Sequence, residues 1–103
     1  MIKITELDIS FVKNYLRVDF EEDDLFIDML ITASQGFIQT YLNQKFTDFE
    51  EVPDELTIPA LTLIAHWYEN REITTDRGAH EILYSFSGIL DMHRLWQGGA
   101  ILI

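Results

Sequence analysis

The sequence has no cysteine, only two prolines, and seven lysine and arginine residues against eighteen acidic ones. Without cysteine the chain cannot form disulfides, use a thiol nucleophile or hold zinc through thiolates, and this fits a reducing compartment. The net charge of −11 argues against a nucleic-acid-binding protein, because such proteins hold phosphates through clustered basic side chains.

Long hydrophobic runs are also missing. No window approaches the roughly 18 uninterrupted apolar residues that a membrane-spanning helix needs, and the opening MIKITELDIS has no stretch typical of a signal peptide. Hydrophobic residues still make up 48% of the chain, which is enough for a folded core. We therefore expect one soluble, intracellular domain spanning residues 1–103.

Residues 54–71 predict the helix around which the domain is built. Their hydrophobic side chains recur at helical spacing on two adjacent faces and leave only a narrow polar stripe. A helix that is apolar over most of its circumference must be surrounded by other elements. Because Pro59 does not fit a helix beyond the first turn, we expect the regular helix to begin near Thr57.

Further helices are expected at residues 8–17, 23–43 and 87–96, and a flexible loop at residues 72–86, of which the apolar part 82–86 could also be extended or helical. The acidic run 21–24 lies just before the long helix, where the helix dipole favours negative charge, and it lacks the spacing of a calcium loop. The predicted fold class is all-α: a small bundle of about four helices around a central apolar helix, with a long loop before the last short helix.

The long predicted helix has two hydrophobic stripes, more than one partner helix covers. The second stripe contains Ile27, Ile31 and Ile38 and belongs either to the core of the subunit or to a contact with a neighbouring subunit. Gly36 lies inside the same helix, where glycine costs up to about 1 kcal/mol, and it indicates a close approach of two helices.

The last six residues, 98–103, are two glycines followed by a short hydrophobic tail. Such a tail predicts either an edge strand packed on the core or insertion into a neighbouring copy.

No group of residues in the sequence predicts an active site. His66 and Glu69 are one helical turn apart, but the segment is not an HExxH motif and a catalytic metal needs about three protein ligands. Gly98 and Gly99 stand alone and do not form a phosphate-binding loop. We therefore expect neither an enzyme nor a bound metal or cofactor, and we interpret His66 as a histidine at the edge of the core.

Three segments of the sequence resemble the small head–tail connector proteins of tailed bacteriophages and prophages, also known as head-completion or DNA-packaging adaptor proteins. KNYLRVDFEEDDLFIDMLITASQGFIQTYLNQKF at residues 13–46 resembles the opening of that family. VPDELTIPALTLIAHWYENRE at 52–72 resembles its most recognisable helix, and residues 82–96, which end in HRLW, resemble its closing helix. The chain departs from the family pattern in lacking a Leu-Pro motif before the last helix.

The resemblance implies a structural, non-enzymatic protein of the virion, made in the host cytoplasm. Such subunits form a homo-oligomeric ring, with a dodecamer as one option, between the portal protein and the next connector or tail-completion protein. DNA passes through the ring without specific binding, and no membrane takes part. Ring contacts would use surplus hydrophobic surface and the scarce arginines, which pair with the acidic half of a neighbour. The candidate subunit-interface residues are Ile27, Ile31, Ile38, Arg71, Arg77, Trp96, Ile101, Leu102 and Ile103.

A second function class remains open from the sequence alone. An acidic DNA mimic would sequester a basic partner with carboxylates arranged like phosphates. The acids of this chain gather at 21–24 and 48–55, which is more local than a regular array.

Overall fold

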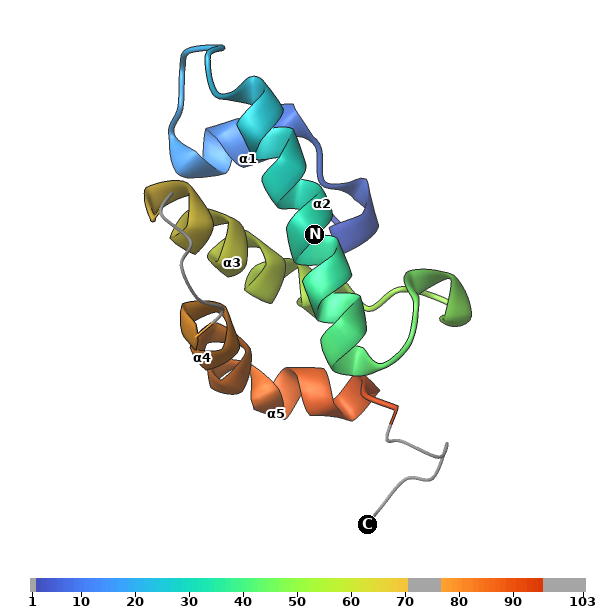
Figure 1. The fold of residues 1–103 in the computed structure, drawn as a ribbon. Coiled ribbons are helices and arrows are strands. Elements are labelled where there is room, and N and C mark those ends of the chain that lie inside the picture. The colour runs from blue at the N-terminus through green and yellow to red at the C-terminus, as the bar shows by residue number, and fades with distance from the viewer. Residues whose placement is uncertain (1, 71–76, 96–103) are drawn as a thin grey trace.

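The computed structural model describes residues 2–70 and 77–95, apart from the side chains of residues 77 and 79 (Figure 1). These ranges contain helices and turns and no β-strand, so the predicted all-α class is confirmed. The α-helices are α1 (Ile9–Leu16), α2 (Asp24–Leu42), α3 (Thr57–Glu69), α4 (Arg77–Ser85) and α5 (Ser87–Leu90). Short 3-10 turns are η1 (Ile4–Glu6), η2 (Phe46–Asp48), η3 (Asp54–Leu56) and η4 (Asp91–His93).

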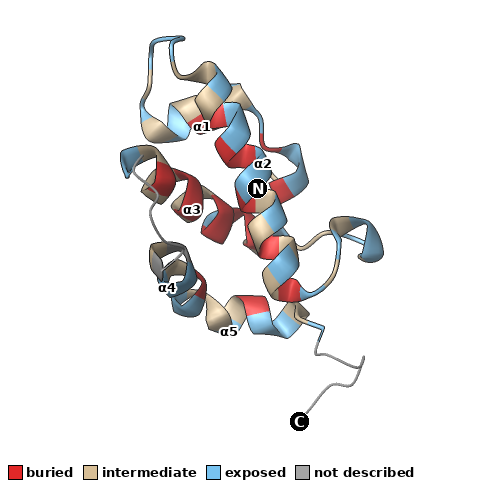
Figure 2. Ribbon diagram, viewed as in Figure 1, coloured by how far each residue is buried: buried red, intermediate tan, exposed pale blue. Residues whose placement is uncertain are grey.

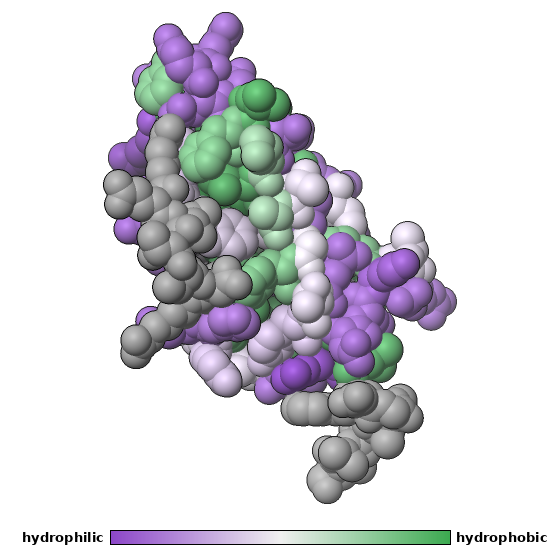
Figure 3. Space-filling model, in the orientation of Figure 1, coloured by the Kyte–Doolittle hydropathy of each residue, from purple (hydrophilic) through white to green (hydrophobic). Residues whose placement is uncertain are grey.

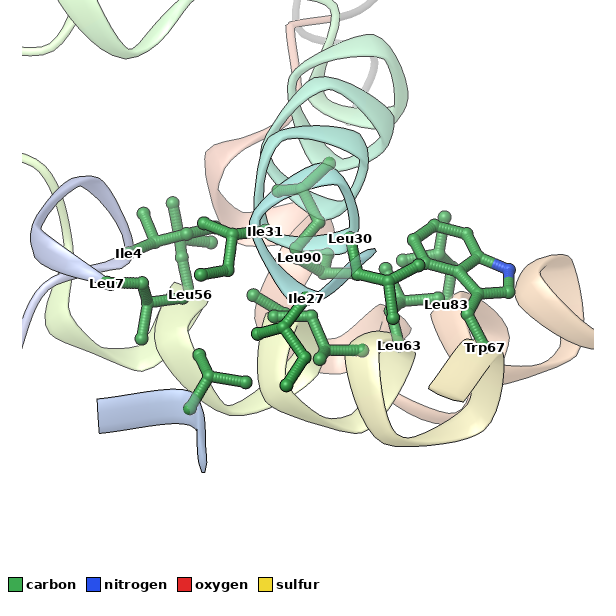
Figure 4. Packing of buried hydrophobic residues seen from close by; sticks show 14 of the residues in the cluster. Ile4, Leu7, Ile27, Leu30, Ile31, Leu56, Leu63, Trp67, Leu83 and Leu90 are labelled. Carbon is green, nitrogen blue, oxygen red and sulfur yellow. The ribbon is translucent and has the colours of Figure 1, made fainter. Parts of the chain in front are cut away.

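The long helix α2 packs across α3, and the other helices are arranged around this pair, with α1 against α2 and α4 against α3 (Figure 1). Each α-helix turns buried residues toward one interior (Figure 2). Their side chains form a single hydrophobic cluster, part of which is shown in Figure 4. The labelled members are Ile4, Leu7, Ile27, Leu30, Ile31, Leu56, Leu63, Trp67, Leu83 and Leu90.

Helix α3 takes the central position that the sequence predicts. Leu63 and Ile64 are fully buried, and Trp67 is only 8% exposed. The regular helix begins at Thr57, as expected, so Pro59 falls in its first turn, where a missing N–H breaks no intrahelical hydrogen bond. The preceding residues form η3 rather than a kinked extension of α3.

The second stripe of α2 lies inside the subunit. Ile27 and Ile38 are fully buried and Ile31 is 4% exposed, so these side chains present no surface to a neighbouring copy. Ser34 continues the stripe and satisfies its hydroxyl by donating to the carbonyl of Ile31 at 2.8 Å. The structure thus places these three isoleucines in the core, which corrects the expectation that they form a subunit interface.

The acidic run 21–24 is a helix start, as the sequence predicts, and it also joins three helices. Asp24 begins α2 and pairs with Lys13 of α1, with 2.9 Å between Nζ and Oδ1. Asp23 accepts a hydrogen bond of 2.6 Å from the Tyr68 hydroxyl of α3. These contacts fix α1 and α3 against the first turn of α2.

The expected loop 72–86 is wrong for most of its length, because residues 77–85 form α4. Leu83 is 1% exposed, and Ile82 and Phe86 pack against the core beside it. The hydrophobic face of α4 packs against α3. The short apolar pattern of this segment is equally compatible with a helix and with an extended strand, so the sequence alone does not predict α4. Residues 72–76 of the expected loop lie outside the described residues.

A series of aromatic ring contacts joins α2, α3 and α4. The rings of Phe37 and Trp67 meet edge to face, with centroids 5.9 Å apart, and Phe37 lies 5.4 Å from the ring of His80. A Cβ placed on Gly78 would lie only 2.5 Å from Nε2 of His66, so the missing side chain lets α4 approach α3 closely.

The N-terminal segment is held against η3. Lys3 Nζ donates to the Asp54 carboxylate and to the carbonyl of Val52, both at 2.8 Å. The Thr57 hydroxyl donates to the carbonyl of Ile2 at 2.7 Å. The hydrogen bond between Lys3 and Asp54 raises the pKa of the Lys3 ammonium and lowers the pKa of the Asp54 carboxyl.

We predict that Gly78→Ala leaves the free energy of unfolding close to that of wild type, because the displacement of the His66 imidazole by the new methyl group offsets the gain from the better helix former. In a His66→Ala background the same change should raise it by up to about 1 kcal/mol, since alanine is the better helix former. Urea unfolding of the two single variants and the double variant gives the coupling. Additive effects would contradict a contact between the two residues.

A second prediction concerns acid stability. The pKa of the Asp54 carboxyl is lowered in the folded state. The stability that its ion pair with Lys3 contributes is therefore fully present above the ordinary carboxyl pKa, and it is lost as the pH falls through the lowered pKa. Asp54→Asn should therefore lower the melting temperature slightly at neutral pH and leave it unchanged in strong acid.

The measurement is thermal unfolding followed by circular dichroism at low salt across the acid range. Glu50→Gln is the control, because it removes one carboxylate from the same acidic segment, residues 48–55, and leaves the Lys3–Asp54 pair in place. A difference between wild type and Asp54→Asn that stays constant down to strong acid would contradict the linkage.

Candidate assembly surface

The described part of the chain has no group of three or more histidine, aspartate or glutamate side chains placed to hold a metal ion. The histidines have structural contacts: His66 lies over Gly78, and Nε2 of His93 is 2.8 Å from the Glu55 carboxylate. Glu69 is exposed at the end of α3. Of the helices in the described ranges, none has the length and hydrophobicity to cross a membrane.

The surface of the described residues includes two shallow grooves. One, of about 730 Å³, lies beside α1 and is lined by Lys13, Arg17 and Asp24 among others. The other, of about 840 Å³, is lined by residues of the acidic segment 48–55, including Glu50 and Glu51, and by His93. Both are open to solvent; the first is lined mostly by polar or charged side chains, and the second also contains Phe49 and Pro53. Neither resembles the enclosed and mainly apolar pocket that small molecules prefer.

The outward side of α2 has a different character. Leu25 is 74% exposed and Met29 is 62% exposed, although both are large hydrophobic residues. They share one side of the helix with Gly36, because positions 25, 29 and 36 recur at helical spacing. We call this side the α2 outer face; its residues, all exposed, are Leu25, Met29, Thr32, Ala33, Gly36 and Thr40.

The α2 outer face carries no charge. The whole segment 29–44 has no acidic or basic residue, in a chain of which 24% is charged. Figure 3 shows a band of hydrophobic and weakly polar surface that follows the course of α2, with strongly hydrophilic residues toward its ends. Asp28 is exposed beside this face. Surface of this kind is suited to contact with protein rather than with phosphate or a small polar ligand.

Smaller hydrophobic groups are exposed elsewhere. Phe11 and Tyr15 lie one turn apart on α1, and Tyr84, Met92 and Leu95 are exposed near the C-terminal end of the described chain. Single exposed hydrophobic residues are common on soluble domains, so among the described residues the continuous α2 outer face stands out.

The end of the described chain is held against the C-terminal end of α2. The backbone N–H of Leu95 donates to the carbonyl of Leu42 at 2.8 Å, and the Tyr41 hydroxyl donates to Asp91 at 2.8 Å. The Arg94 guanidinium lies 4.7 Å above the Tyr41 ring. Burial, and then the hydrogen bond to Asp91, raise the pKa of the Tyr41 hydroxyl. Leu95, the last residue of the described range 77–95, therefore lies beside the C-terminal end of α2.

The predicted interface residues have different outcomes. The three isoleucines of α2 are in the core, and Arg77 begins α4 but its side chain is not described. The other predicted interface residues, Arg71, Trp96, Ile101, Leu102 and Ile103, lie outside the described residues. Sequence reasoning missed Leu25 and Met29, although the charge-free segment 29–44 and their helical spacing with Gly36 are readable in the sequence.

Comparison with protein families identifies the chain. A family model for the phage gp6-like head-tail connector protein matches residues 6–94, which includes every α-helix of the described ranges. No curated protein and no solved structure gave a significant match. The matched range is far more than half of the chain, and it agrees with the resemblance seen in the sequence. The chain therefore belongs to the phage gp6-like head–tail connector family, whose members are structural proteins of the head–tail junction.

Proposed function

We propose that this chain is a subunit of a homo-oligomeric ring that docks on the portal protein, extends the DNA channel and receives the next connector or tail-completion protein. The observation that carries the proposal is the family match over residues 6–94, because it covers the whole described helical body rather than one motif. On this proposal the protein is made in the host cytoplasm and acts in the virion as a single connector-like domain.

The charge distribution supports a role at a DNA channel. The chain has a net charge of −11, and acids such as Glu21, Glu22 and Glu50 are exposed. DNA phosphates are repelled by a surface of like charge, so a duplex would pass such a ring without adhering to it.

The contacts between subunits in a closed ring are heterologous, since one face of each copy meets a different face of the next. We propose that residues 98–103 reach a neighbouring copy, and that Arg71 and Arg77 pair with acids of a neighbour. Support for the first part comes from the path of the chain, since the described body ends beside the end of α2. A basic side chain is scarce here, with seven in 103 residues, so each one is a candidate partner for the surplus acids.

We predict that the full chain adds to purified portal rings as a defined multimer, and that a variant lacking residues 98–103 adds at least ten times more weakly. The expected loss follows from removal of four hydrophobic residues from the contact between copies. Light scattering behind a sizing column measures the absolute mass of chain alone, portal alone and the mixture, over a concentration series.

Full-length chain that neither self-associates nor changes the mass of the portal ring would contradict the proposed ring. Truncated chain that adds as well as the full chain would remove residues 98–103 from the interface and leave the ring assignment in place. The truncated variant must first show the same helical content and melting temperature as the full chain.

A further inference from the structure

We propose that the α2 outer face is the surface on which a second copy of this chain docks, with Gly36 at the point of closest approach. The inference rests on the proposed ring and goes further by naming the surface and its occupant. It concerns a face that the sequence alone does not assign to the interface.

The α2 outer face is continuous and exposed in the described subunit. At about 100° of rotation per residue, its six members fall within an arc of roughly 100°. All six are exposed, whereas Ile27, Ile31 and Ile38 on the opposite side are buried against the rest of the subunit. One side of α2 therefore builds the core, and the other side leaves two large hydrophobic residues exposed in the described subunit.

Gly36 supplies an independent observation. A Cβ built at this position meets no atom within 4 Å, so no packing inside the described subunit requires a glycine there. The backbone does not require one either, because Gly36 lies within the regular helix and its φ is not positive. Glycine in the middle of a long helix is unfavourable, and the space that it leaves on the exposed side of α2 lets another backbone approach closely.

Gly78 shows what such a contact looks like within the subunit. There a Cβ would lie 2.5 Å from the imidazole of His66, so the missing side chain is used by a neighbouring element. The same relationship at Gly36 needs an element from outside the described subunit.

Charge favours a second copy as the occupant. Two copies of a chain with net charge −11 repel each other wherever their acidic surfaces meet. The α2 outer face has no acid of its own, so another acidic chain can approach it without bringing carboxylates together. A basic partner, by contrast, would select the acidic surfaces at 21–24 and 48–51, because charge complementarity steers association.

The size of the face limits the strength of the contact. A helix of 19 residues is about 28 Å long and about 10 Å wide, so one side offers roughly 300 Å². A stable interface buries roughly 800 Å² on each partner. The α2 outer face alone therefore supports weak association, which becomes stable when a portal ring holds several copies side by side. We expect the free chain to be monomeric at micromolar concentration.

The test compares glycine substitutions in the full chain. Gly36→Ala should raise the melting temperature by a few degrees, because the methyl group meets no atom in the subunit and alanine favours the helix. It should also weaken addition to portal rings several-fold, and Gly36→Gln should weaken it at least tenfold. Gly88→Ala is the matched control, since Gly88 is also helical, exposed and free of atoms within 4 Å of a built Cβ. This control should leave addition unchanged.

A second readout uses the absence of cysteine from the chain. In Met29→Cys the new thiol is the only one, and maleimide should label it at least ten times more slowly in the portal-bound assembly than in the free chain. The free chain is the reference for the same thiol, so a general change in reactivity does not imitate protection.

The outcomes separate the two proposals. The docking face would be overturned if Gly36 variants add to portal rings like wild type. It would also be overturned if the introduced thiol at position 29 labels at the same rate in the free and the portal-bound state. Either result would leave the proposal of a ring in place. Wild type that fails to add to portal rings and to itself would overturn both. A Gly36→Ala variant that melts lower than wild type would overturn the claim that nothing within the subunit needs this glycine.

Discussion

The packing of α2 across α3 is the contact on which the rest of the structure depends. Ile27 and Leu30 of α2 lie on the side of Leu63 and Trp67 of α3 in the interior of the cluster, and Ile31 lies beside Leu56. Short helices such as α1 and α5 are marginal alone and are stable because this pair offers them a hydrophobic surface. The same pair fixes the direction in which the outward side of α2 points, so core packing determines where the surface for a partner lies.

Much of this fold is predictable from the sequence. Helices α1, α2 and α3 are long or strongly periodic. Asp8 caps α1 by accepting a 2.8 Å hydrogen bond from the N–H of Phe11, and acids precede α2. The sequence wrongly predicts a loop at residues 77–85, because the helix there is stabilised by Leu83 and Phe86 packing on the core, and contacts distant in sequence leave little local signal.

The surface is harder to predict than the core. A stripe of isoleucines predicts burial, but it does not tell whether the stripe is buried in the core of the subunit or in a contact between subunits. The structure places Ile27, Ile31 and Ile38 in the core of the subunit. The exposed side chains of Leu25 and Met29 are hydrophobic too, and only the positions of α1 and α3 show that these two remain uncovered. Composition cannot distinguish the two sets, because both are apolar residues of one helix at helical spacing.

The neutral side of α2 has a further consequence for how copies meet in solution. A particle with a net charge of −11 and one helix side without charged residues is attracted to its own kind in few orientations. Random encounters are repelled before contact, so wrongly oriented pairs are shorter-lived than they are between neutral particles. The acidity of the chain would thus favour correctly oriented encounters during assembly. It would also keep unassembled copies at high concentration from aggregating through the exposed hydrophobic residues that a ring requires.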